Sequence, residues 1–270
     1  MPNEPGGPST PSTPPLLPTE ADHALAGALA TRAGELLVEL RSTAPSATDE
    51  DRRALKDEGD RQAHELLMAS LAERLGAGDA VLSEEGVDDP IRLGARRVWI
   101  VDPLDGTREF GEVPRTDWAV HVALAIDGAP VAGAVALPAL GLTLASGAPL
   151  PTLAPPPGRP RVIVSRSRPP AAAVWLADQL GGDLVEMGSA GAKAMAVVRG
   201  EADIYAHSGG QYEWDSCAPV AVALAAGLHA SRIDGSPLVY NLANPYLPDL
   251  LICRPDLADA ALEALATFDG

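Results

Sequence analysis

The sequence of 270 residues contains only two cysteines, Cys217 and Cys253. Two cysteines cannot build the disulfide framework of a small secreted domain, which favours a reducing, cytoplasmic location. The opening stretch, MPNEPGGPSTPSTPPLLPTE, lacks the basic segment, the apolar segment and the cleavage site of a secretion signal. Its proline, serine and threonine content is typical of a disordered tail, which we assign to residues 1–19.

Long hydrophobic runs and positive charge are also scarce. The longest apolar run, near Ala119 to Ile126, is interrupted by His121 and is far shorter than the roughly 20 residues of a membrane span. Lysine and arginine total 20 against 37 acidic residues, which gives a net charge of -17. This charge disfavours nucleic acid polymers and anionic membranes as partners. A small anionic substrate can still bind where bound cations reverse the local charge, so the acidic composition points to a metal-dependent site.

Several catalytic motifs are absent. The five histidines form no HExxH or HxxxH pattern, so zinc is not indicated. The sequence has no G-x-S-x-G elbow, no Walker loop and no D-x-D-x-D-G calcium loop. Cys217 has no histidine near it in the sequence, which favours a buried thiol over a nucleophile.

What is present is a globular pattern, with 46% hydrophobic residues, enough for one large core or two smaller ones. Apolar residues at helical spacing predict a helix over 20–41, with Thr19 and Asp22 as its cap. A second helical stretch follows, interrupted at Gly59 and ended at Gly76. The next segments predict a largely antiparallel sheet with a hairpin at "DGAP", in strands 80–82, 97–101, 118–126, 131–137 and 142–145.

The second half alternates strands with helices, which favours an α/β layer. The predicted strands are 161–165, 184–187, 202–206 and 250–253, and the predicted helices are 169–180, 190–199, 215–226 and 256–267. A proline-rich stretch, 146–160, separates the halves. We therefore predict an N-terminal α+β metal-binding domain over 20–150 and a C-terminal α/β domain over 151–270 that completes the active site.

The segment WIVDPLDGTREF carries the first chemical signal. Pro103 biases Asp102 toward an extended backbone at a strand end, and Asp105-Gly106-Thr107 is typical of a turn that opens a helix. Both carboxylates, with the carbonyl of Leu104 between them, are then oxygen ligands beside backbone N–H groups suited to an anion. This combination describes a magnesium-assisted phosphoryl site.

The alternative is that Asp105 only caps a helix and Asp102 only forms a turn. Other carboxylates argue against it, because each one lies where a predicted element ends, begins or is interrupted. Glu84 and Glu85 follow a strand in VLSEEG, Asp215 opens a helix in YEWDSCAP, and Asp60 lies at the glycine interruption of the second helix. These positions suggest convergence on one site.

SEEG, WIVDPLDGTREF and EWDSCAPVAVALAAG resemble, in order and separation, the metal motifs of the inositol monophosphatase superfamily. Within it, DGTREF, VLSEEG, IVSRSRPP and GSAGAK resemble the CysQ-type branch, the 3'(2'),5'-bisphosphate nucleotidases. The resemblance covers nearly everything from Asp22 to Cys253. It implies the layered αβαβα sandwich of that superfamily, which joins the α+β and α/β halves.

The resemblance also implies residue roles. The magnesium ligands would be Glu84, Asp102, the carbonyl of Leu104, Asp105 and Asp215, with Glu85 a less certain ligand. Asp60, with Thr107 as its partner, would activate the attacking water, and the amides of Gly106 and Thr107 would contact the transferred phosphate.

The implied activity is Mg2+-dependent removal of the 3'-phosphate from 3'-phosphoadenosine 5'-phosphate, and from its sulfated form, by metal-activated water without a covalent intermediate. Two or three ions would take part. Lithium inhibition and a link to sulfate assimilation are expected from the family. Hydrolysis of inositol 1-phosphate or fructose 1,6-bisphosphate, or a non-catalytic anion-binding role, are the alternatives. The sequence does not determine the oligomeric state, although this superfamily is commonly dimeric.

The substrate contacts have competing interpretations. Ser189 and Lys193, in GSAGAKAM, suit a sugar or a second phosphate, or simply a helix start packed on the sheet. Arg166, with Arg168, suits a 5'-phosphate, or is a surface arginine without a role. His207, in a glycine-rich loop, faces the base or sugar, or is merely exposed.

Overall fold

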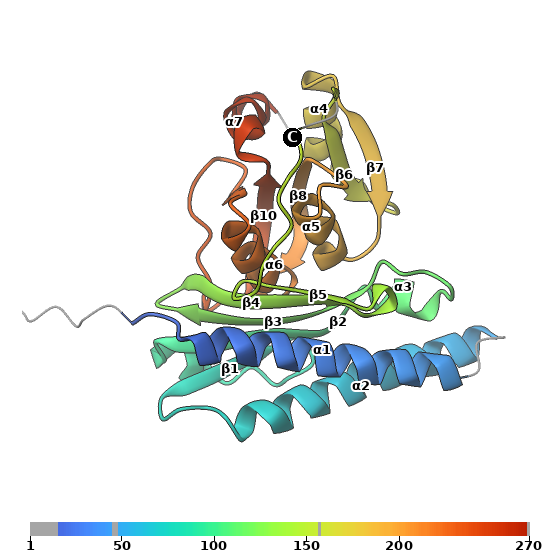
Figure 1. The fold of residues 1–270 in the computed structure, drawn as a ribbon, viewed down its shortest axis with the longest axis vertical. Coiled ribbons are helices and arrows are strands. Elements are labelled where there is room, and N and C mark those ends of the chain that lie inside the picture. The colour runs from blue at the N-terminus through green and yellow to red at the C-terminus, as the bar shows by residue number, and fades with distance from the viewer. Residues whose placement is uncertain (1–15, 45–47, 156–157, 269–270) are drawn as a thin grey trace, which may run out of the picture.

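The computed structural model describes residues 16–44, 48–155 and 158–268. The fold has five layers, in the order helices, sheet, helices, sheet, helices (Figure 1). The predicted layered sandwich is therefore confirmed. Most of the predicted tail, residues 1–15, lies outside the described residues.

The first layer is a pair of long helices, α1 (Glu20–Thr43) and α2 (Asp49–Ala72). Each begins with a capping box, in which a threonine side chain and the third helical residue satisfy each other's backbone N–H groups. Thr19 and Asp22 form the first box, as the sequence predicts. The prediction that Gly59 interrupts the second helix is wrong, because α2 continues through it. It ends at Ala72, before Gly76.

The first sheet has the order β1-β2-β3-β4-β5. Only the β1–β2 pair is parallel, so the predicted antiparallel character is correct for the rest. Asp127 and Gly128 turn the predicted hairpin with φ of 50° and 82°, as a tight hairpin turn requires. The strands are β1 (Asp79–Ser83), β2 (Arg97–Asp105), β3 (Ala119–Ile126), β4 (Ala129–Leu137) and β5 (Leu142–Ala145).

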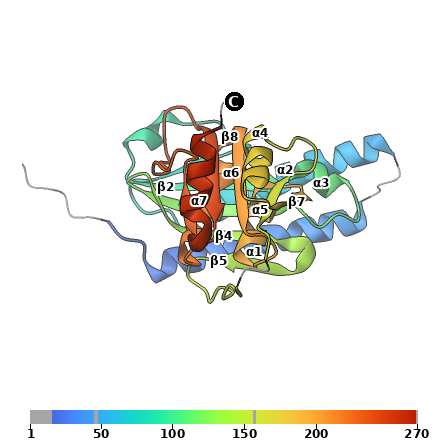
Figure 2. The same cartoon turned by 90° about the horizontal axis from the view of Figure 1, so that it is seen from above.

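The second sheet has the order β7-β6-β8-β10-β9. The helices α5 and α6 lie between the two sheets, and α4 and α7 lie side by side on the outer face (Figure 2). The strands are β6 (Arg161–Ser165), β7 (Asp183–Met187), β8 (Ile204–Tyr212), β9 (His229–Ser231) and β10 (Tyr246–Cys253). The helices are α4 (Ala171–Gln179), α5 (Ala190–Val198), α6 (Glu213–Ala225) and α7 (Ala258–Ala266).

The sequence pattern did not predict β9 or several short helical turns. It also ended the strand before α6 at Ala206, whereas β8 continues to Tyr212 through Gly209 and Gly210. Both glycines have a positive φ and lie where the pairing with β10 shifts register. Because paired glycines are typical of loops, the sequence predicted a loop at this point. The short turns are η1 (Pro90–Gly94), η2 (Pro138–Leu140) and η3 (Pro255–Leu257). The short helix α3 (Thr107–Gly111) begins at the turn that Asp105-Gly106-Thr107 predicts.

The largest core joins both halves of the chain. It contains Ile100 and Val135 of the first sheet, Met195 of α5, Val220 of α6 and Leu250 of the second sheet. Because both faces of the first sheet are covered, β3 is buried along its whole length. The two predicted domains thus share one interior, and the N-termini of α5 and α6 approach the carboxyl end of β2.

None of the described helices is both long enough and apolar enough to cross a membrane.

Candidate metal centre

Two neighbouring strands deliver acidic residues to the same edge of the first sheet. In the parallel β1–β2 pair, Ser83 lies opposite Val101, and the amide of Glu84 donates to the carbonyl of Val101 at 3.3 Å. Glu84 therefore follows the end of β1 at the level where β2 reaches Asp102. This confirms that the two motifs meet.

Three aspartates converge from β2 and α6. One carboxylate oxygen from each of Asp102, Asp105 and Asp215 lies within 4.8 Å of the others. Asp102 is 1% exposed and Asp105 7% exposed. Asp215 is the third residue of α6, where its Oδ2 accepts a hydrogen bond from the amide of Tyr212 at 2.7 Å. The convergence proposed from sequence is thus present for these residues.

The carboxylates perturb one another. Burial, followed by repulsion from Glu84, Asp105 and Asp215, raises the pKa of Asp102 well above its usual range. Burial and the charge of Asp105 raise the pKa of Asp215 to about 7. Glu84 is an exposed residue, but its carboxyl is partly desolvated. This desolvation and repulsion from neighbouring acids raise the pKa of the carboxyl to about 7. Without a compensating cation, this much negative charge is unfavourable here.

Asp105 differs from its neighbours because donors from α5 surround it. The hydroxyl of Ser189 donates to Oδ2 at 2.5 Å, and the amides of Ala190 and Gly191 donate at 3.1 and 2.6 Å. Burial alone would raise the pKa of Asp105, but His121, Lys193 and Ser189 outweigh it and lower the pKa. Asp105 is therefore ionised and fixed in orientation.

His121 is a site residue that the sequence analysis missed. It lies opposite Asp102 in the β2–β3 register, is fully buried, and places Nε2 3.2 Å from Oδ2 of Asp105. Its Nδ1 lies 3.0 Å from the carbonyl of Trp214, which identifies Nδ1 as the donor. A histidine within an otherwise apolar strand was the available signal, but only the register shows its partners.

Gly191 makes room for this histidine. A Cβ at position 191 would lie 2.0 Å from Nε2 of His121, so a side chain there would displace the imidazole. The glycine in GSAGAK thus has a packing reason within the site.

Asp60 reaches the site from α2. The hydroxyl of Thr107 lies 3.3 Å from Oδ1 of Asp60 and 3.0 Å from the carbonyl of Leu104, which links the residue to one predicted ligand. Burial and repulsion from Glu85 raise the pKa of Asp60 to about 7. A carboxyl that titrates near neutral pH suits proton transfer to or from water.

Gly106 separates β2 from the short helix α3. Its φ is 83°, and a Cβ there would lie 3.0 Å from Cβ of Ser189 and 3.3 Å from the carbonyl of Asp117. Both the left-handed backbone and the close approach of α5 favour glycine at this turn. The predicted contact of Gly106 and Thr107 with phosphate is compatible with this geometry, and it stays a prediction.

Two predicted substrate contacts are engaged within the protein. Nζ of Lys193 is buried and donates to the carbonyls of Gly188 and Ser189 at 3.1 and 2.5 Å. Arg166 donates from Nε to Glu109 at 3.0 Å and from Nη2 to Glu112 at 2.5 Å. A bound phosphate would compete with these acceptors, so their substrate roles stay predictions.

His207 lies on β8 and is half-buried rather than merely exposed. Its Nε2 lies 2.6 Å from the carbonyl of Gly209, whereas Nδ1 is buried without a hydrogen-bond partner among the described residues. Burial lowers its pKa to about 4, so the imidazole is neutral at pH 7. An available acceptor is compatible with the predicted contact to a sugar or base.

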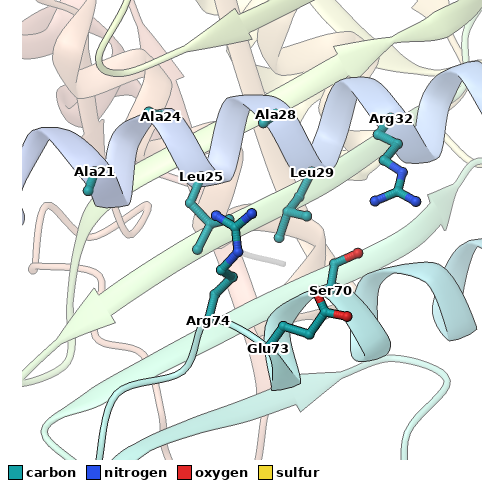
Figure 3. A pocket seen from close by; sticks show the side chains of 9 residues that line it. All are labelled: Ala21, Ala24, Leu25, Ala28, Leu29, Arg32, Ser70, Glu73 and Arg74. Atoms are coloured by element: carbon teal, nitrogen blue, oxygen red, sulfur yellow. The ribbon is translucent and has the colours of Figure 1, made fainter.

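A separate pocket, of about 400 Å³, opens between α1 and the C-terminal end of α2 (Figure 3). Leu25 and Leu29 of α1 face Ser70, Glu73 and Arg74 across it. None of the clustered aspartates lines this pocket, so it is distinct from the acidic centre.

The acidic centre fits hard divalent cations. Its donors are all oxygens, and two of its three clustered aspartates, Asp102 and Asp105, are buried. Burial and mutual repulsion raise the pKa of Asp102 and of Asp215, so a cation would stabilise their charged forms. Mg2+ prefers such carboxylates together with water and substrate phosphate. Glu84 adds a fourth acid at the exposed edge.

Comparisons with known proteins agree with this chemistry. A family model described as the inositol monophosphatase family matches residues 20–150 and 163–265. The 3'-phosphoadenosine 5'-phosphate phosphatase of Mycobacterium leprae (strain TN) is 52% identical over 257 residues, which cover 89% of this chain and 92% of that protein. The 3'(2'),5'-bisphosphate nucleotidase CysQ of Escherichia coli (strain K12) is 32% identical over 199 residues, 68% of this chain and 79% of that protein.

A solved structure has the same architecture. CysQ from Bacteroides thetaiotaomicron superposes with a TM-score of 0.75 at 26% identity, covering 87% of this chain and 97% of that one.

Proposed function

Because the chain belongs to the inositol monophosphatase family, we propose that it is a magnesium-dependent phosphatase that removes the 3'-phosphate of 3'-phosphoadenosine 5'-phosphate. The relatives that carry this activity in their names support the substrate. The observation that carries the proposal is the convergence of Asp102, Asp105 and Asp215 at one strand end. The sulfated nucleotide is proposed as a second substrate.

Glu84, Asp102, the carbonyl of Leu104, Asp105 and Asp215 would hold two or three Mg2+ ions. Bound Mg2+ supplies positive charge to the phosphoryl oxygens and lowers the pKa of an attacking water. The protein fixes this ligand set before the substrate arrives, because α5 orients Asp105 and the amide of Tyr212 orients Asp215.

Asp60 and Thr107 are the proposed pair that positions the water and takes its proton. The carboxyl has a pKa of about 7, so near neutral pH a substantial fraction is ionised and can accept a proton at Oδ1. Burial raises the pKa of the Cys217 thiol well above its usual range, so this residue is not an alternative nucleophile. We propose direct attack by water, without a covalent intermediate.

For the substrate, we propose that the amides of Gly106 and Thr107 bind the transferred phosphate. Ser189, Lys193, Arg166 and His207 would line the remainder of the nucleotide, with Ser189 and Lys193 acting mainly through Asp105. We also propose a cytoplasmic location, supported by two buried free thiols.

The test is phosphate release by the purified protein with 3'-phosphoadenosine 5'-phosphate, inositol 1-phosphate and fructose 1,6-bisphosphate. We expect the highest kcat/KM with the nucleotide, loss of activity with EDTA, and recovery on adding Mg2+. A higher kcat/KM with either sugar phosphate would instead assign that substrate. Inactivity with all three would indicate a non-catalytic anion-binding protein.

Asp60→Asn tests the proposed base. We expect kcat to fall about 100-fold with little change in KM, since general base catalysis contributes about 100-fold or more. The control is Glu65→Gln, an exposed acid on the same helix that pairs with Arg61, for which kcat should change less than about twofold. Full activity of Asp60→Asn would contradict the assignment.

A further inference from the structure

Three aromatic side chains form a cluster next to Asp215. The rings of Tyr212 and Trp214 stack with centroids 4.9 Å apart and planes 6° apart, and Tyr246 packs edge-on against Tyr212 at 5.8 Å. Tyr212 is the last residue of β8, Tyr246 is the first residue of β10, and the two are paired in the sheet. The amide of Tyr212 donates directly to the carboxylate of Asp215.

The exposure of this cluster is unusual for this chain. The whole sequence has only two phenylalanines, four tryptophans and four tyrosines. Among the aromatic residues that the structure describes, Tyr212 and Tyr246 are the most exposed, at 41% and 39%. The amide of Tyr212 binds Asp215 of the proposed metal centre, and Tyr246 packs against Tyr212. Exposed aromatic surface beside a site marks a binding function.

The cluster is also held in place. Trp214 fixes one side of Tyr212 by stacking, and the hydroxyl of Tyr246 accepts a hydrogen bond from the amide of Gly210 at 3.2 Å. Ordered rings lose little conformational entropy on binding. The exposed rings therefore suit a flat, uncharged group. Binding of such a group is not opposed by the net charge of -17.

We propose that the exposed ring surface of Tyr212 and Tyr246 is the subsite that binds the purine base of the substrate by stacking. This inference rests on the proposed function and adds to it a reason for choosing a nucleotide over a sugar phosphate. A sugar phosphate offers no aromatic face to these rings, whereas a purine stacks on them.

The test compares wild type with Tyr212→Ala and Tyr246→Ala. Truncating Tyr212 keeps its backbone amide, so the hydrogen bond to Asp215 persists. We expect the ratio of kcat/KM for 3'-phosphoadenosine 5'-phosphate to that for inositol 1-phosphate to fall about tenfold in each variant, mostly through KM for the nucleotide. Tyr212→Phe and Tyr246→Phe should keep the wild-type ratio, because they retain the ring.

Calorimetric titration gives a readout independent of turnover. AMP should bind about tenfold more weakly to Tyr212→Ala than to wild type, and ribose 5-phosphate, which lacks the base, should bind both equally. An unchanged ratio and unchanged AMP affinity in both alanine variants would overturn the subsite. A change of oligomeric state in the variants without a change in AMP affinity would overturn it too, assigning the rings to contact with a second copy.

The two proposals fail differently. If wild type releases no phosphate from 3'-phosphoadenosine 5'-phosphate, the proposed function fails. If wild type hydrolyses it and the alanine variants keep the preference for nucleotide, only the base subsite fails.

Discussion

At the scale of single residues, the charge balance around Asp105 decides how the centre is built. Its carboxylate receives three hydrogen bonds from the start of α5 and faces the imidazole of His121. Asp102, three residues earlier on β2, accepts a hydrogen bond from the amide of Leu104 but has no comparable set of donors among the described residues, and its pKa is raised instead. One acid is thus held ionised by the protein, while the other depends on a cation.

His121→Asn should weaken this arrangement. We expect kcat/KM to fall about tenfold at saturating Mg2+, because Asp105 loses the imidazole that faces its carboxylate and whose pKa that carboxylate raises. The free energy of unfolding in EDTA should fall by about 1–3 kcal/mol. Steady-state kinetics and urea unfolding measure the two effects. His229→Asn, at a half-buried histidine of β9, is the control and should leave kcat/KM unchanged. Wild-type kinetics in His121→Asn would contradict a positioning role.

Asp203 predicts part of the pH dependence of stability. Burial would raise its pKa, but hydrogen bonds from the backbone and side chain of Arg161, at 2.9 and 3.0 Å, lower it below 3.8. A lowered folded-state pKa stabilises the protein above the unfolded value, and this contribution is lost as pH falls through the folded value.

Urea unfolding from pH 7 to pH 3 therefore should show a smaller loss of stability in Asp203→Asn than in wild type below about pH 4. At pH 7 the variant should be less stable by about 2 kcal/mol, since charged hydrogen bonds are lost. Parallel pH curves for the two proteins would show that Asp203 does not titrate as proposed.

At the scale of elements, α2 explains how a remote helix contributes Asp60. Gly59 lies where the helix crosses α3, and a Cβ there would lie 2.8 Å from Phe110 and 3.0 Å from Leu104. The glycine permits close packing instead of breaking the helix. Asp60, the next residue, is thereby brought to Thr107.

Gly59→Ala should therefore destabilise the protein although alanine favours helices. We expect a loss of about 1–3 kcal/mol in the free energy of unfolding from overpacking. Gly27→Ala in α1 is the control, because its Cβ would meet only Ala145 at 3.7 Å, and it should stabilise by about 0.5–1 kcal/mol. Equal stabilisation by both substitutions would contradict the packing argument.

At the scale of the whole molecule, the acidic cluster joins the two halves of the chain. Asp102 and Asp105 come from the first sheet, and Asp215 comes from the helix layer beneath the second. A cation bound by all of them therefore links segments that are distant in sequence and relieves their repulsion.

Mg2+ should raise the melting temperature relative to EDTA by about 5 °C or more at saturating concentration. Asp102→Asn removes one charge from the cluster, so its melting temperature in EDTA should equal or exceed that of wild type, and its turnover should be abolished. The shift on adding Mg2+ should largely disappear in this variant. A full shift in Asp102→Asn would contradict the proposed ligand set.

The sequence alone determined the local features. Capping residues predicted where α1 begins, alternating apolar residues predicted most strands, and turn chemistry predicted the hairpin at Asp127 and Gly128. The spacing of acids within WIVDPLDGTREF and their place at the ends of elements also predicted a metal motif, and its two aspartates do lie beside Asp215. These signals act between residues close in the chain, so they can be interpreted without a structure.

Only the tertiary structure decided which side chains meet. Strand register places His121 opposite Asp102, packing turns Lys193 back onto carbonyls of its own helix start, and two glutamates of the α3 region occupy Arg166. The exposed faces of Tyr212 and Tyr246 likewise depend on pairing between β8 and β10. The physical reason is that the direction and surroundings of a side chain depend on non-local pairing, which sequence spacing does not contain.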